Sequence, residues 1–121
     1  MTRERIGEVV VDGVAHAIEI DPESRQIEAD VQGHVAFILF RTSGSELALI
    51  HTEVPPALRG KSIAEALARA ALDYARSHQM TVKPICPFVA RFVRRHQEYQ
   101  DLVAPALDPS SISEGLRKGP V

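Results

Sequence analysis

Residues 51–67, HTEVPPALRGKSIAEAL, decide the fold, because the chain changes there from strand-like to helix-like patterning. Pro55-Pro56 cannot continue a central strand, since proline lacks a backbone donor. Ser62 precedes Glu65 by three positions, which is the capping-box spacing that opens a helix. The alanine-rich run that follows keeps one apolar and one charged face at helical spacing, to about His78. We therefore predict a strand, a loop and a helix in this order.

Upstream of this junction the pattern predicts a meander of antiparallel strands. Asp12-Gly13 suits a two-residue hairpin, because glycine tolerates a positive φ. Val35–Phe40 is a continuous apolar run, which is typical of a strand covered on both faces. The predicted strands are Glu8–Val11, Val14–Ile20, Arg25–Val31, Val35–Phe40 and Leu47–Thr52, joined by turns at Asp12-Gly13, Asp21–Ser24, Gln32-Gly33 and Ser43–Ser45.

Downstream of the first helix, at about Ile63–His78, the sequence predicts a short strand and a second helix. Thr81–Ile85 is β-prone, and Pro87 suits the first position of a helix over roughly Phe88–Arg95. Strand, helix and strand form a βαβ unit, so Leu47–Thr52 and Thr81–Ile85 are predicted to be parallel neighbours with a right-handed crossover. The predicted fold class is therefore mixed α/β, an antiparallel meander leading into a parallel pair with covering helices.

The length and composition of the chain limit the number of domains and the classes of partner that we expect. The chain has 121 residues and a formal net charge of −2, without the basic excess of a general nucleic-acid binder. No apolar stretch reaches the roughly 18–20 residues that span a bilayer, and the start MTRERIGEVV lacks the apolar run of a secretory signal. We expect a cytoplasmic protein with neither nucleic acid nor membrane as partner. We expect an N-terminal extension with a possible extra strand (1–14), one domain (15–103) and a flexible tail (104–121).

The sequence indicates neither a disulfide nor a metal site. Cys86 is a single cysteine, so no internal disulfide can form. The histidines His16, His34, His78 and His96 show no metal-ligand spacing, and we predict no metal site.

The loop before the first helix is a candidate anion site. Backbone N–H groups at residues 60–64 lack helical partners, and the helix dipole adds partial positive charge to them. Arg59 and Lys61 add full positive charges, and helix ends of this kind bind phosphate. The spacing of these residues alone is equally compatible with a helix N-terminus that binds only water.

Arg59–Ala64, RGKSIA, resembles the pyrophosphate-binding motif of the GNAT superfamily of acyl-CoA N-acyltransferases, (Q/R)-x-x-G-x-(G/A). Arg59 fits its first position and Ala64 its last, whereas Ser62 stands where the motif has glycine. HTEVPPALRG, the alanine-rich helix and VKPICPFVARFVRRHQEY together look like the compact branch of this superfamily that carries a cysteine-proline pair. The resemblance covers roughly Ala15–Val103.

The resemblance implies a GNAT-like fold and acetyl-CoA as the cofactor. In this superfamily the two parallel strands splay apart around the pantetheine arm. Carried over to this chain, backbone groups of Thr52, Glu53 and Val54 line the thioester arm. The backbone N–H groups of Arg59, Gly60, Lys61, Ser62, Ile63 and Ala64 hold the pyrophosphate. Serine at position 62 either weakens the cofactor affinity or supplies another hydrogen bond.

Three side chains are candidates for the chemistry. Cys86 lies at the end of the second parallel strand, where its thiol is expected to line the cofactor site near the acyl thioester, and at a helix N-terminus, a place that favours a thiolate. The compact branch carries a cysteine at this place, proposed as an acyl acceptor; the alternative is a small buried hydrophobe. Glu53 is a candidate acceptor of a proton from an amine, or else a solvated carboxylate. His51, two residues earlier on the same strand face, is a candidate proton-transfer group or a structural histidine.

Two further features have open interpretations. Tyr99 is a candidate to protonate the departing CoA thiolate, as a tyrosine often does in GNAT enzymes, or else a packing residue. Arg91, Arg94 and Arg95 form a basic helix face that either approaches the nucleotide phosphates or is simply solvated.

The expected function is the transfer of an acetyl group from acetyl-CoA to a primary amine, directly or through a cysteine acyl-enzyme. The second expected function is that of a regulatory protein that binds CoA without turnover. In a third interpretation the chain has the same fold, binds no cofactor and serves as an interaction module. No motif reports the acceptor, which is a small molecule or a protein lysine. We expect a monomer or a weak homodimer.

Overall fold

The computed structural model describes residues 2–103, and the predicted tail lies outside them. Six strands form one mixed sheet, in which each strand neighbours the next along the chain. The strands are β1 (Glu4–Val11), β2 (Val14–Asp21), β3 (Gln26–Val31), β4 (His34–Ser43), β5 (Glu46–Glu53) and β6 (Thr81–Pro84). The helices are η1 (Pro56–Leu58), α1 (Ile63–Ser77), α2 (Pro87–Arg95) and η2 (Gln97–Leu102).

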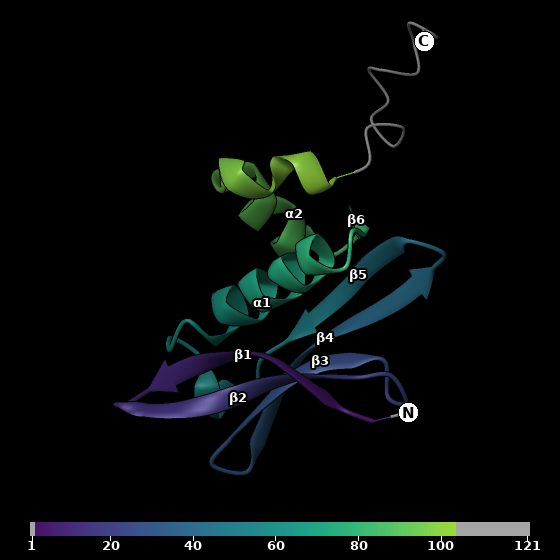
Figure 1. Cartoon of the computed structure of the whole chain (residues 1–121). Helices are drawn as coiled ribbons and strands as arrows, with labels where there is room; N and C mark the ends of the chain where they lie inside the picture. Colours follow the sequence, from purple (N-terminus) through teal and green to yellow (C-terminus); the bar gives the residue numbers. More distant parts are fainter. Residues whose placement is uncertain (1, 104–121) are drawn as a thin grey trace, which may run out of the picture.

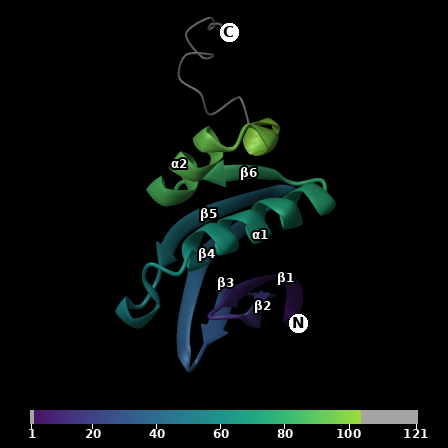
Figure 2. The same cartoon turned by 90° about the vertical axis from the view of Figure 1, so that its left-hand side faces the viewer.

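The sheet curls around α1, and α2 lies against α1 on the side away from β1 (Figure 1). Figure 2 shows α1 running along the sheet and α2 beside β6. The core fills the space between the inner face of the sheet and these helices, and it includes the fully buried Ile18, Ile38 and Leu67. At one point β1 approaches α1 so closely that a Cβ on Gly7 would lie 3.1 Å from the Cβ of Ala70. The mixed α/β prediction is confirmed.

The antiparallel meander agrees with the sequence pattern in its turns and differs at its start. Asp12-Gly13 and Gln32-Gly33 both have two consecutive positive φ angles, the backbone of a type I′ hairpin turn. The first strand begins at Glu4 rather than Glu8, and its residues pair along β2. The possible extra strand is therefore part of the sheet.

The parallel pair forms as predicted but is short. Pairing runs from Glu46 opposite Thr81 only as far as Leu49 opposite Pro84. On its other side β5 has an extra residue, Ile50, because Leu39 of β4 pairs with His51 and Phe40 with Leu49. Such a bulge bends and twists its strand. The last residues of β5 therefore continue without a partner in β6, and the two strands part at their carboxyl ends.

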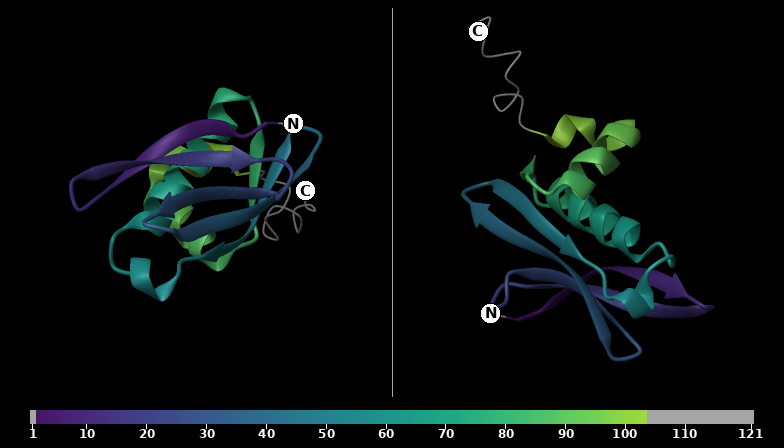
Figure 3. Two further views of the ribbon diagram at one scale, coloured as in Figure 1. Left: turned by 90° about the horizontal axis from the view of Figure 1, so that it is seen from below. Right: turned by 180° about the vertical axis from the view of Figure 1, so that it is seen from behind.

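The prediction that β4 is covered on both faces is wrong. Its inward residues are buried, whereas Val35 is 40% exposed and Phe37 and Leu39 are half-buried on the outer face. The reason is that α1 and α2 both pack on the inner side and contact each other. Within residues 2–103 no helix crosses the outer face of β2–β4, and these strands lie in front of the helices in Figure 3, left.

Tyr99 fastens η2 to α1. This tyrosine is buried, and its hydroxyl donates to Asp73 Oδ1 at 2.8 Å while it accepts a hydrogen bond from Arg69 at 3.4 Å. Asp73 lies about 15 Å along the helix from its first residue. Burial and, second, the hydrogen bond to Asp73 raise the pKa of Tyr99. The structure agrees with the packing interpretation of Tyr99 and holds its hydroxyl away from the helix N-terminus.

We expect Tyr99→Phe to lower the free energy of unfolding by about 1 kcal/mol, because the hydrogen bond to Asp73 is lost while the ring stays packed. Urea unfolding measures the change. Tyr74→Phe is the matched control, since its ring stacks on His78 and no acceptor for its hydroxyl is found within residues 2–103. The control should change stability by less than about 0.5 kcal/mol. An equal loss in both variants would contradict the role of the Tyr99 hydroxyl.

Candidate active site

The loop between β5 and α1 leaves a set of backbone donors at the helix end. Arg59 N–H donates to Pro56 C=O at 3.3 Å, and Arg59 Nε donates to Val54 C=O at 3.3 Å. The first hydrogen bond into the helix runs from Ala66 N–H to Ser62 C=O at 3.2 Å. The N–H groups before Ala66 have no helical partner. The predicted cradle therefore begins at Gly60, because the N–H of Arg59 is already engaged.

Ser62 has a left-handed backbone, with φ 61° and ψ 26°, and its side chain makes no capping hydrogen bond. The predicted capping box is therefore wrong, because a capping side chain reaches the helix N–H groups from an extended backbone. The same conformation gives a physical reason for glycine in the motif, since glycine adopts a positive φ without strain. Gly60 also has a positive φ, of 80°. Without a capping side chain, the N–H groups that open α1 stay free for another acceptor.

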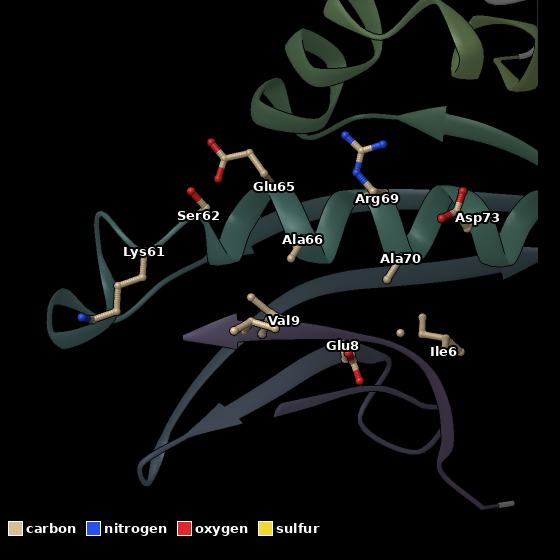
Figure 4. Close-up of a pocket in the computed structure, with 12 residues that line it drawn as sticks. Ile6, Glu8, Val9, Lys61, Ser62, Glu65, Ala66, Arg69, Ala70 and Asp73 are labelled. Carbon is tan, nitrogen blue, oxygen red and sulfur yellow. The ribbon is translucent and has the colours of Figure 1, made fainter. Parts of the chain in front are cut away.

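Lys61 lies beside the tip of the β1–β2 hairpin. Its Nζ is 3.6 Å from Asp12 Oδ2. This contact could not be predicted from residue spacing, because it depends on how the sheet curls. From Lys61 and Ser62 a groove of about 430 Å³ continues between β1 and α1. Ala66 and Ala70 point toward β1 in this groove (Figure 4).

Thr52 and Cys86 meet where β5 and β6 part. Thr52 Oγ1 and Cys86 Sγ lie 3.2 Å apart, within hydrogen-bonding distance, and Cys86 is 4% exposed. The N–H of Cys86 donates to Leu49 C=O at 2.9 Å, which ties the start of α2 to the last paired residue of β5. The thiol therefore lies at the inner side of the gap between the two strands, at the N-terminus of α2.

His51 and Glu53 form a second pair, on the other face of β5. His51 Nε2 is 2.9 Å from Glu53 Oε1, and both side chains are 59% exposed. Side chains alternate along a strand. The pair therefore points to the outer face while Thr52 points inward. The structure brings the predicted residues together as two pairs, Thr52 with Cys86 and His51 with Glu53, rather than as one cluster.

A hollow of about 330 Å³ between α1 and α2 adds a feature that the sequence analysis missed. Its lining residues are Glu65, Phe88, Arg91, Phe92, Arg95 and His96. Four of them, at positions 88, 91, 92 and 95, follow the spacing of a single helix face, and this spacing was the available signal. Arg91 and Arg95 thus point to a shared space, whereas Arg94 does not line it.

Within residues 2–103, no three His, Cys, Asp or Glu side chains gather as metal ligands. In the same part of the chain, no helix combines the length and apolar character that a membrane crossing requires.

Several curated relatives of the chain carry the name Protein NATD1. The Protein NATD1 of Danio rerio is 32% identical over 91 residues, which cover 71% of this chain and 83% of that protein. The Protein NATD1 of Bos taurus is 34% identical over 82 residues, which cover 65% of this chain and 73% of that protein. The Homo sapiens protein of the same name is 33% identical over 82 residues, with 65% and 73% covered.

A family model described as GCN5-related N-acetyl-transferase matches residues 26–102, more than half of the chain. The match begins at β3 and ends with η2, so it includes the parting strands, the loop with free donors and both helices that adjoin it. These features agree with the resemblance found in the motif around Arg59–Ala64. The chain belongs to the GCN5-related N-acetyltransferase (GNAT) family.

Proposed function

We propose that the protein transfers an acetyl group from acetyl-CoA to a primary amine. The observation that carries this proposal is the uncapped N-terminus of α1 beside two strands that part, with Cys86 and Thr52 inside the gap. Acetyl-CoA supplies the acetyl group as a thioester. The chain has to hold its anionic end, place its thioester in the gap and take a proton from the amine.

The groups that hold the anionic end are backbone donors and basic side chains. The N–H groups from Gly60 to Ala64 and the dipole of α1 suit a pyrophosphate. Lys61 adds a charge once it leaves Asp12, with which it forms an exposed pair at 3.6 Å. Arg91 and Arg95, at the hollow between α1 and α2, suit the nucleotide phosphates. This donor set fits a polyanion with two separate groups of charge.

The groups that serve the transfer lie on both sides of β5. Backbone groups of Thr52, Glu53 and Val54 follow the point where pairing with β6 ends, so they are accessible to the thioester arm. Glu53, in contact with His51, accepts the proton of the incoming ammonium from the outer side. Positioning two substrates in one gap accounts for most of the rate.

Two routes for the acetyl group remain within this proposal. In direct transfer Glu53 first takes the proton of the ammonium. The amine nitrogen then attacks the thioester carbonyl, the carbon–sulfur bond breaks, and the second proton of the nitrogen goes to the departing CoA thiolate. In the stepwise route Cys86 Sγ attacks the thioester first and its proton goes to the departing CoA thiolate; the deprotonated amine then attacks the Cys86 thioester, and the second proton of its nitrogen restores the Cys86 thiol. The 3.2 Å contact between Cys86 and Thr52 favours the stepwise route, because the hydroxyl holds the sulfur at the gap.

A second candidate function is binding of CoA without turnover. It is favoured by the separation of the two pairs, since His51 and Glu53 face away from Cys86 across β5. Both candidates require the cofactor, and only the first produces an acetylated amine.

We expect millimolar acetyl-CoA to raise the melting temperature by several degrees, because a ligand at 100 times its dissociation constant stabilises by about 2.7 kcal/mol. Arg91→Glu with Arg95→Glu should remove most of this shift by placing carboxylates at the hollow. Arg94→Glu is the control and should keep it, because Arg94 lies outside the hollow. Differential scanning fluorimetry measures all three proteins. No shift in the folded wild-type protein would contradict both candidate functions.

We expect Ser62→Gly to raise the free energy of unfolding by about 1 kcal/mol, because the left-handed backbone at this position strains a residue with a Cβ. Urea unfolding is the measurement. Ser77→Gly, within α1, is the opposite control and should lower stability, since glycine weakens a helix. A loss of stability in Ser62→Gly would show that the hydroxyl makes a contact that outweighs the strain.

We expect incubation with acetyl-CoA, without an amine, to add one acetyl group to the intact protein. Cys86→Ala should abolish the addition while it keeps the melting shift caused by acetyl-CoA. Intact-mass spectrometry and fluorimetry give the two readouts. If the wild-type mass stays unchanged while an added amine is still acetylated, direct transfer is the route.

A further inference from the structure

The charges of the chain divide between its two halves, although the net charge is only −2. Residues 3–53 carry ten Asp or Glu and four Arg, and residues 54–103 carry eight Lys or Arg and four Asp or Glu. The first stretch forms β1–β5, and the second forms the loop, the helices and β6. A divided charge of this kind attracts an anion to one side and a cation to the other. The basic side already has an anionic occupant in the proposed cofactor.

The acidic side has an uncovered surface, which we call the outer sheet face: Glu19, Glu28, Asp30, Val35, Phe37 and Glu53. Strand pairing sets Glu19 beside Glu28, Glu28 beside Phe37, and Phe37 beside Glu53. Asp30 is likewise opposite Val35. An apolar stripe on β4 therefore has carboxylates on both sides. This stripe is the outward half of the apolar run that the fold does not bury.

The carboxylates of this face outnumber the basic side chains that pair with them. Arg3 Nη1 is 3.2 Å from Glu19 Oε1, its Nη2 is 3.4 Å from Asp21 Oδ2, and it also pairs with Glu28. One guanidinium is thus shared among three carboxylates. Asp30 lies outside this network, and its Oδ1 accepts only a backbone hydrogen bond, from Gly33 at 3.0 Å. A hollow of about 540 Å³ is bordered by Arg3, Glu19, Glu28 and Asp30, and Val35 lines it as well.

The outer sheet face leads directly to the gap between β5 and β6. Glu53 is its last member and sits where β5 has lost its partner strand. Thr52 and Cys86 lie on the inner side of this gap, whereas the exposed His51 and Glu53 lie on its outer side, from which an acceptor amine can reach Glu53. Four adjacent strands, β2–β5, span about 14 Å. This width exceeds what one amine occupies, and it includes apolar residues that a small hydrophilic amine would not use.

We propose that the outer sheet face docks a basic, extended segment of another polypeptide, whose lysine side chain is the acetyl acceptor. Apolar side chains of the segment pack on Val35 and Phe37, and flanking cationic residues lie against Glu19, Glu28 and Asp30. The acceptor lysine reaches Glu53 and loses its proton there. This inference rests on the proposed acetyl transfer for its chemistry, whereas the docking itself requires only the charge and the apolar stripe.

The test compares two synthetic peptides, both N-acetylated and C-amidated. One is Arg-Leu-Lys-Leu-Arg and the other is Glu-Leu-Lys-Leu-Glu, so they share the acceptor and differ in charge. With acetyl-CoA we expect the basic peptide to be acetylated with at least a tenfold higher kcat/KM, an advantage that should shrink as salt rises. Fluorescence anisotropy of the labelled basic peptide measures docking independently of turnover.

Val35→Lys tests the face itself, and Glu23→Gln is a control matched in charge, since each raises the net charge by one. Glu23 is exposed in the β2–β3 turn, away from the stripe. We expect Val35→Lys to weaken binding of the basic peptide about fivefold or more, and Glu23→Gln to leave it near the wild-type value. The melting shift with acetyl-CoA should stay the same in both variants.

The outcomes separate the two proposals. Equal use of both peptides, or equal effects of the two variants, would overturn the docking inference. Acetylation of spermidine but of neither peptide would overturn it as well and leave the acetyltransferase proposal standing. Salt-sensitive binding of the basic peptide that Val35→Lys weakens would support the docking surface even if no amine were acetylated, and the acetyltransferase proposal alone would then fail.

Discussion

The extra residue at Ile50 of β5 is the constraint on which the rest of the structure depends. Up to Leu49 the strand pairs on both sides, and beyond Ile50 it pairs only with β4. The bulge also reverses which side chains face inward, so that Thr52 points to the core side and His51 and Glu53 point outward. Pairing with β6 ends at the same point, because β6 itself ends at Pro84, which has no backbone N–H. The opening and the two-sided arrangement of polar groups therefore meet at Ile50.

The N-terminus of α1 has N–H groups without acceptors because no side chain caps it. A serine with an extended backbone would satisfy a helix N–H with its own oxygen. At Ser62 the left-handed backbone prevents this, and the N–H groups before Ala66 are left without a helical acceptor. The strain of a left-handed serine, about 1 kcal/mol, is small against the free energy of a charge-assisted hydrogen-bond set. Under the proposed function, this small strain is why a position occupied by glycine in the motif can hold serine.

Most of the fold could be predicted from the sequence, because local patterns determined it. Alternating strands, Asp12-Gly13 and Pro87 each fixed an element within a few residues. The predictions that were wrong concerned features that depend on packing between distant parts of the chain. The run Val35–Phe40 looked fully buried, since a sequence cannot show that both helices pack on one side. Ser62 has capping composition but a backbone that the preceding loop dictates. In the site, the contact between Cys86 and Thr52 and the one between Lys61 and Asp12 join residues far apart in the chain.

The short pairing of β5 with β6 also has a consequence for the order of folding. Every antiparallel pair in the sheet joins strands linked by a tight turn, so each closes a small loop. The pairing of Glu46 with Thr81 closes a loop that contains all of α1, and larger loops lose more chain entropy. The meander can therefore assemble before the last strand docks. From this topology we expect the pairing of β5 with β6 to form late and to open early, so that local unfolding there would expose Cys86 while the rest of the sheet stays paired.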